Sequence, residues 1–237
     1  MGAPGTSPRR ERLNRERVLA AAVALADSEG VDALSMRRLA DHLGVVPMAL
    51  YKHVAHKEAL LDGMVEQVIA EIDAPDPGAG WRAALRDRTL SARRALLRHP
   101  WARRVLETRT TQTPAVLEYL DATIAVLRRD GFSDELTHHV MHALGSRAWG
   151  FTQELFVAPA PAAAPPDPET LRAVLERFPN VAAIASPARH DGATVVGTGC
   201  DDQAEFEFAL DLVLDGIALR HAQGWTPPPP TAPEVTP

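Results

Sequence analysis

The sequence predicts an all-α fold, and three observations lead to that prediction. Apolar residues recur every three to four positions in one segment after another, and no segment alternates apolar and polar residues as a half-buried strand would. Residues 35–57 have the spacing of two short helices joined by a tight turn. With 237 residues, 46% of them hydrophobic, the chain is long enough to bury one large core or two smaller ones.

The first predicted helix begins after the cap residue Asn14 and ends at Gly30, with Glu16 in its first turn. Its apolar face holds Val18, Leu19, Ala22, Val23 and Ala26. Residues 1–13 precede this helix as a flexible arm with three arginines. Such an arm either reaches the phosphates or the minor groove of a nucleic acid or is a solvated basic tail.

The segment from Ser35 to Lys57 predicts a helix-turn-helix. Gly44 can adopt the positive backbone angle that closes the first helix, and Pro47 suits the first turn of the second, where its missing N–H is not needed. The residues that two helices crossing at a steep angle would bury between them are Leu39, Ala40, Leu43, Val45 and Leu50. The second helix turns Met48, Ala49 and Lys52 to solvent, and a face of this kind suits the major groove of DNA.

This segment resembles the N-terminal domain of the TetR family. The residues that carry the resemblance are Gly30-Val31-Asp-Ala-Leu-Ser35, Leu39-Ala40, Leu43-Gly44-Val45, Leu50-Tyr51-Lys-His53-Val54 and Lys57, within residues 14–72. Three residues depart from the commonest family pattern: the bulky Val46 and Met48, and His56 where a small polar cap is usual. A helical hairpin that merely packs is the alternative interpretation.

The resemblance implies a set of DNA contacts. Arg37 corresponds to the base-reading arginine of the family, which can pair with a guanine, and the residues that correspond to positions facing base edges or thymine methyls are Pro47, Met48, Ala49 and Lys52. The phosphate-contacting positions correspond to Ser35, Tyr51, His53 and Lys57. A packed ring is the alternative for Tyr51, and a helix cap is the alternative for His53. The charge distribution favours a nucleic-acid partner at this end, since residues 1–60 hold nine Lys or Arg against seven Asp or Glu, whereas the remainder is acidic.

Residues 57–72 form the next predicted helix, which connects the DNA-binding domain to the rest of the chain. Its apolar stripe consists of Leu60, Leu61, Met64, Val68 and Ile72. Residues 73–80 are rich in Pro and Gly, and we place a domain boundary there. The predicted organisation is therefore an arm at 1–13, a DNA-binding domain with its connecting helix at 14–72, a second helical domain at 81–224 and a disordered proline-rich tail at 225–237.

Helical spacing continues through the second domain, over residues 81–99, 101–107, 114–130, 134–156, 168–178 and 203–223. The last helix is apolar on two sides: one holds Phe206, Leu210, Val213, Leu214 and Ile217, and the other holds Phe208, Leu212 and Leu219. A helix of this kind is buried between its own domain and a partner, and a second copy of the chain is the economical partner. Residues 81–154 and 205–212 resemble the C-terminal domain of the tetracycline-repressor branch, which implies a four-helix dimer interface made by helices 134–156 and 203–223.

The same resemblance implies that the second domain binds a small-molecule inducer. The pocket positions correspond to Arg109, Leu120, Thr123, His138, Met141, His142 and Trp149. A magnesium-tetracycline complex is not expected, because Val105 stands where the magnesium-binding imidazole should be, and only Glu154 matches a metal-associated carboxylate. Aromatic residues such as Trp149, Phe151 and Tyr119 favour a mostly apolar molecule, with Arg109 or His142 orienting a polar group.

Three histidines, His138, His139 and His142, raise an alternative from another class, a helical metal-dependent enzyme. His138 and His142 lie four residues apart, as metal-binding pairs often do. No glutamate general base accompanies them at the right spacing, and the chain carries no phosphate-binding glycine loop or nucleophile elbow. We therefore expect no catalytic residue, no metal site and no cofactor.

The sequence thus predicts a homodimeric, ligand-responsive transcriptional regulator. We expect a repressor that binds a palindromic operator in double-stranded DNA and is released by a small-molecule inducer. The first residues hold no apolar run of signal-peptide length, and no later stretch reaches the roughly 18 to 20 apolar residues that would span a bilayer. We therefore expect no membrane partner and a cytoplasmic protein.

Overall fold

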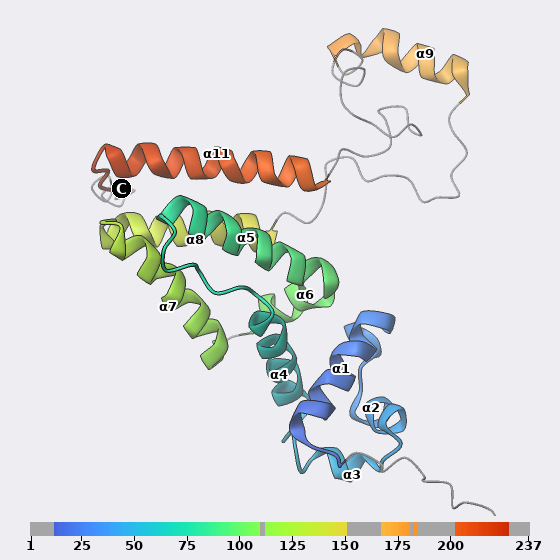
Figure 1. Cartoon of the computed structure of the whole chain (residues 1–237). Coiled ribbons are helices and arrows are strands. Elements are labelled where there is room, and N and C mark those ends of the chain that lie inside the picture. Colours follow the sequence, from blue (N-terminus) through green and yellow to red (C-terminus); the bar gives the residue numbers. More distant parts are fainter. Residues whose placement is uncertain (1–11, 110–111, 151–166, 181–182, 184–201, 228–237) are drawn as a thin grey trace, which may run out of the picture. The chain divides into compact units, whose positions relative to one another are not determined.

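A computed structural model of the chain describes residues 12–109, 112–150, 167–180, 183 and 202–227. All the regular structure of these residues is helical, which confirms the predicted fold class (Figure 1). The chain divides into two compact units, one formed by Met1–Pro77 with Ser91–Ala125 and the other by Gly78–Leu90 with Val126–Pro237. The chain passes from one unit to the other at three points. The first lies in the Pro/Gly-rich segment 73–80, and the other two lie inside helices α5 (Trp81–Arg98) and α7 (Pro114–Arg129).

The first unit begins with the predicted helix-turn-helix and its bracing helices. These are α1 (Arg15–Glu29), the 3-10 turn η1 (Val31–Ala33), α2 (Met36–Leu43), α3 (Pro47–Leu50) and α4 (Lys57–Ala70). Helix α1 contacts both α2 and α4, and α2 packs on α3. Gly44 has the left-handed conformation that ends α2, with a φ of 65°, as its place in the sequence predicts.

Side chains start three of these helices. The Asn14 side chain accepts a hydrogen bond from the N–H of Arg17 at 2.8 Å and so begins α1. Ser35 accepts from the N–H of Arg38 at 3.2 Å and begins α2. His56 begins α4, because its Nδ1 accepts from the N–H of Ala59 at 3.1 Å. An imidazole therefore fills the cap position that usually holds a smaller polar residue.

The core of this segment follows the predicted apolar positions closely. Leu39, Ala40 and Leu50 are fully buried, whereas Leu43 and Val45 are only half-buried. The stripe of α4 is buried along its whole predicted length, from Leu60 to Ile72. Helix α4 also contacts α6 (Trp101–Glu107), so its apolar face joins the helix-turn-helix to the rest of the first unit.

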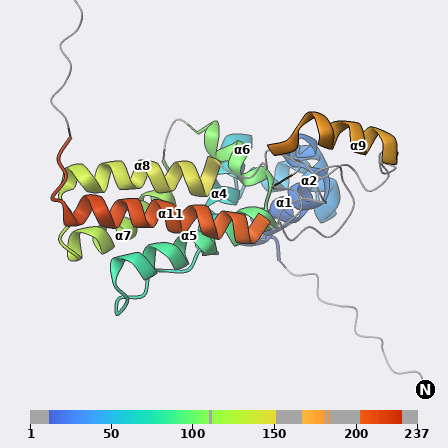
Figure 2. The same ribbon diagram turned by 90° about the horizontal axis from the view of Figure 1, so that it is seen from above.

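In the second unit, α8 (Asp134–Gly150) and α11 (Asp202–Ala222) lie side by side (Figure 2). Their shared core consists of Leu85, Leu127, Phe132, Leu136, Val140, Leu144, Phe206, Leu210, Leu214 and Ile217. The predicted helix 134–156 is described as far as Gly150, and residues 151–156 lie outside the described residues. Helix α9 (Pro168–Arg177) matches its predicted range to within one residue. None of the described helices is long and apolar enough to cross a membrane.

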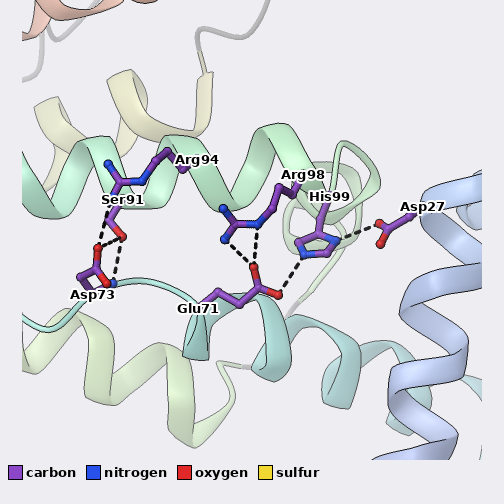
Figure 3. Close-up of polar contacts among 7 residues, drawn as sticks. All are labelled: Asp27, Glu71, Asp73, Ser91, Arg94, Arg98 and His99. Atoms are coloured by element: carbon purple, nitrogen blue, oxygen red, sulfur yellow. Dashed lines mark hydrogen bonds and ion pairs between the residues drawn. The ribbon is translucent and has the colours of Figure 1, made fainter.

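A buried histidine ties three segments of the first unit together (Figure 3). His99 follows α5, and its Nδ1 lies 2.8 Å from a carboxylate oxygen of Asp27 in the last turn of α1. Its Nε2 lies 3.0 Å from a carboxylate oxygen of Glu71, the residue that ends α4. A carboxylate can only accept hydrogen bonds, so both contacts are hydrogen bonds when each ring nitrogen carries a proton.

Neighbouring donors complete this His99 bridge. The indole N–H of Trp101 donates to Asp27 at 2.6 Å, and the guanidinium of Arg98 donates to Glu71 at 2.6 Å. Burial opposes ionisation of Glu71, but the hydrogen bonds from Arg98 and His99 outweigh it and lower the pKa of Glu71 below its ordinary value. The end of α4 is therefore held by charge-assisted hydrogen bonds to the corner between α5 and α6.

We expect His99→Ala to lower the free energy of unfolding by about 1–3 kcal/mol, because it strips a buried partner from both Asp27 and Glu71. Urea denaturation followed by circular dichroism measures this change. His42→Ala, which removes an exposed imidazole from α2, is the matched control and should change little. Equal midpoints for the two variants would show that the bridge adds no stability.

Glu71 should also make the stability of the chain depend on pH. Its folded pKa lies below the ordinary value of 4.5, so its stabilising effect is present above that value and is lost as the pH falls through the folded pKa. Melting temperatures measured from about pH 6 down to about pH 3 should therefore fall less steeply for Glu71→Gln than for the unmodified chain. Glu118→Gln, on the exposed side of α7, should leave the slope unchanged.

Candidate DNA interface and ligand-binding region

The helix-turn-helix presents a surface formed by α2, the turn after it and α3. The exposed residues among the predicted DNA contacts are Ser35, Arg37, Pro47, Met48, Tyr51, Lys52 and Lys57, and the half-buried ones are Ala49 and His53. Leu50 and Val54 turn into the core. Tyr51 is 44% exposed, which disfavours the alternative of a packed ring. His53 is not the residue that caps α4, since His56 does so.

The basic residues of this surface are free to meet phosphates. Within the described residues, Arg37, Lys52 and Lys57 form no ion pair, whereas Arg15 and Arg38 pair with Glu66 and Glu29. Ser35 uses its oxygen as an acceptor at the start of α2 and keeps its O–H as a donor. The surface can therefore supply several hydrogen-bond donors to DNA without first breaking an ion pair.

Three of the predicted ligand contacts belong to the first unit. Arg109 follows α6, and its Nη1 lies 2.6 Å from Glu58 and 3.1 Å from Asp62, both on α4. Burial opposes the charge of Arg109, but hydrogen bonds to these carboxylates outweigh it and raise the pKa of Arg109. Its Nε is buried and has no hydrogen-bond partner among the described residues. Arg109 is thus a polar tie between α6 and α4.

The other two contacts of the first unit lie on α7. Leu120 is half-buried. Thr123 is buried, and its hydroxyl donates to the backbone oxygen of Tyr119 at 2.8 Å.

The remaining predicted ligand contacts belong to the second unit. His138 and His142 are exposed on α8, with ring centroids 4.6 Å apart, and Met141 is half-buried against the core. Trp149 lies in the last turn of α8, but its side chain, like Phe151 and Glu154, falls outside the described residues. No group of three His, Cys, Asp or Glu among the residues that the structure describes is placed to hold a metal ion.

Helix α11 keeps its second apolar face exposed, as predicted. Phe208, Leu212 and Leu219 are 63%, 56% and 57% exposed. An open hollow of about 630 Å³ lies between α8 and α11, lined by Leu136, His139, Val140, Ala143, Val213, Gly216, Ile217, Arg220, Trp225 and Pro227. A Cβ added at Gly216 would meet nothing within 4 Å, so another backbone could approach closely there.

Sequence reasoning missed the His99 bridge. A histidine between an arginine and a proline at the end of a helix has no local signal of burial, and its partners Asp27 and Glu71 are 72 and 28 residues away. Val46, which departs from the family pattern, is one of the most exposed apolar residues of the helix-turn-helix, and its exposure has no signal in the local sequence.

Comparison with known proteins identifies both parts of the chain. A family model described as "Bacterial regulatory proteins, tetR family" matches residues 18–64, and one described as "Tetracyclin repressor-like, C-terminal domain" matches residues 74–220. The HTH-type transcriptional repressor DrrR1 of Streptomyces coeruleorubidus is 31% identical over 217 residues, which cover 89% of this chain and 79% of DrrR1. Tetracycline repressor protein class C of Escherichia coli is 29% identical over 209 residues, covering 87% and 91%.

Solved structures agree with the sequence relatives. The TetR family protein ActR of Streptomyces coelicolor, in complex with (S)-DNPA, has a TM-score of 0.64 at 26% identity and covers 89% of this chain and 99% of ActR. The matched families and relatives are transcriptional regulators, so they do not support the alternative of a metal-dependent enzyme. From its helix-turn-helix to its last helix, the chain belongs to the TetR family of bacterial regulatory proteins.

Proposed function

We propose that this chain represses transcription by binding a palindromic operator as a homodimer and that a small-molecule inducer releases it. The observation that carries the proposal is the exposed helix-turn-helix surface, whose cations have no ion-pair partner within the described residues. Membership of a family of regulators supports the same function. The similarity to DrrR1, a transcriptional repressor, favours repression over activation. A regulator that acts on the chromosome of a bacterium works in the cytoplasm, which is where we place this chain.

Each half-site contact follows from the residue type. Arg37 forms the bidentate hydrogen bonds that guanine accepts on its major-groove edge. The other base contacts are Pro47, Met48, Ala49 and Lys52, and the phosphate contacts are Ser35, Tyr51, His53 and Lys57. Lys57 is the first residue of α4, where its charge and the N-terminal end of the helix both favour a phosphate.

We place the DNA-binding domain with its connecting helix at residues 14–72 and the ligand-binding and dimerisation domain at 81–224. The family models support these limits, since they match residues 18–64 and 74–220 and so leave the Pro/Gly-rich segment near the boundary.

The dimer forms through α8 and α11. Within the part of the chain that the structure describes, three large apolar side chains on one face of α11 are more than half exposed, and a second molecule that covers them would bury their surface. A two-fold axis brings the same helices of a second copy against this face. Two recognition helices then fall about 34–36 Å apart, the spacing of successive major grooves.

The inducer contacts that the family resemblance implies are Arg109, Leu120 and Thr123 in the first unit and His138, Met141, His142 and Trp149 in the second, and Arg109 is the contact from which we derive induction. Arg109 holds α4 through Glu58 and Asp62, and α4 carries the helix-turn-helix. A polar group on the inducer that competes for the guanidinium weakens this tie, and α4 is then free to tilt. A change in tilt alters the spacing of the two recognition helices, so the dimer no longer matches its operator.

Two substitutions separate base reading from phosphate binding. Arg37→Ala should cost about 1–3 kcal/mol of operator binding and relax specificity at one base pair. Lys57→Ala should weaken binding to all sequences alike and reduce the slope of log affinity against log salt by about one. Fluorescence anisotropy at several salt concentrations measures both effects. Arg128→Ala, in the second unit, is the control, and a loss of the same size there would contradict the assigned interface.

A charge on the exposed face of α11 should break the dimer. Leu212→Asp puts a carboxylate into the interface twice, once from each copy, and we expect the dimer to weaken roughly 100-fold because neither charge finds a partner. Sedimentation velocity measures the monomer fraction. Leu117→Asp, at an equally exposed leucine of α7, should leave the dimer intact. A dimer that survives Leu212→Asp would place the interface elsewhere.

A further inference from the structure

The start of α3 is apolar on the outside, where a helix that enters DNA would meet base edges. Val46 is 68% exposed and Met48 is 70% exposed, and they are the most exposed large apolar side chains among the described residues. Neither packs into the core of the first unit, since Leu50 is the residue of this helix that is buried. Folding therefore gives no reason for a large apolar side chain at either position.

Helix capping makes Val46 more unusual. Side chains of Asn14, Ser35 and His56 accept hydrogen bonds at the starts of α1, α2 and α4. Val46 occupies the same position before α3 and makes no side-chain cap. A Ser, Thr, Asp or Asn there would stabilise the helix, so the chain gives up a local hydrogen bond at the start of α3. Departures from local rules of this kind are expected at functional sites.

We propose, on the basis of the DNA-binding function proposed above, that Val46 and Met48 read thymine by contact with its C5 methyl group. The N-terminal residues of a recognition helix are those that contact base edges. In the major groove each base edge presents donors and acceptors, and the methyl group of thymine is the apolar exception. An apolar helix start is therefore complementary to an A·T pair.

The same side chains act against a G·C pair. Guanine presents two acceptors and cytosine an amino donor in the major groove. Placing Val46 or Met48 over these atoms expels water and supplies no hydrogen bond in exchange. Exposed cations nearby in the sequence, Arg37, Lys52 and Lys57, supply the affinity for guanine and phosphate. Each half-site should therefore combine the guanine read by Arg37 with at least one thymine whose methyl group faces the start of α3.

The test removes single methyl groups from DNA. A duplex is first selected from a random library by the full-length protein, and each thymine is then replaced in turn by deoxyuridine, which lacks only the C5 methyl. Affinities are measured for the unmodified protein, Val46→Ala, Met48→Ala, Lys52→Ala and Leu97→Ala. The last variant shortens an exposed apolar side chain of α5 and is the matched control.

We expect at least one thymine per half-site at which deoxyuridine weakens binding about fourfold, the effect of leaving one methyl group in water. That sensitivity should disappear in Val46→Ala or Met48→Ala. It should persist in Leu97→Ala, and also in Lys52→Ala, although Lys52→Ala binds all duplexes more weakly. Since Val46 and Met48 are exposed, neither alanine variant should change the melting temperature.

The outcomes separate this inference from the proposed function. If a duplex is selected but no thymine is sensitive to replacement by deoxyuridine, Val46 and Met48 do not read thymine. The same conclusion follows if the sensitivity survives in both alanine variants. In either case the proposed function as a DNA-binding regulator still holds. If the library yields no preferred duplex, the DNA-binding function fails, and the inference fails with it.

Discussion

One buried imidazole fixes the position of the helix-turn-helix relative to the connecting helix α4 and the corner before α6. His99 lies between Asp27 of α1 and Glu71 at the end of α4, so the brace of the helix-turn-helix, the connecting helix and the corner before α6 meet at a single side chain. Apolar packing along α4 is non-directional, whereas hydrogen bonds act only over a narrow range of distance and angle. The hydrogen bonds of His99 therefore fix the angle between α1 and α4, while the apolar stripe of α4 supplies most of the buried apolar surface.

Arg109 is a second polar tie on the same connecting helix, at its opposite end. It holds Glu58 and Asp62 near the start of α4, and His99 holds Glu71 at the end. Both ties come from segments next to α6. A rearrangement of α6 would therefore act on both ends of α4. A small shift of α6 would then change the tilt of α4. Regulation through such ties is economical, because exchanging one charged partner for another changes geometry without exposing the core.

The recognition surface follows different rules from the rest of the first unit. Its cations are unpaired within the described residues, and Val46 and Met48 expose apolar surface that folding does not use. Elsewhere in the same unit, basic residues such as Arg15, Arg38 and Arg98 pair with carboxylates. Val46 makes no side-chain cap at the start of α3, and departures from local rules of this kind are expected at functional sites.

The sequence by itself determined most of the helices, the cap at Asn14, the turn at Gly44 and the second apolar face of α11, because these depend on residues within a few positions of one another. The second helix of the helix-turn-helix is shorter than predicted, since α3 ends at Leu50 and Lys52 lies in the turn after it. Its family resemblance also identified the class of regulator. Only the tertiary structure placed His99 against Asp27 and Glu71, and Arg109 against α4, since such pairs join residues that are distant in sequence and leave no periodic pattern. Exposure at Val46 likewise depends on how α3 packs on α2, which no local spacing specifies.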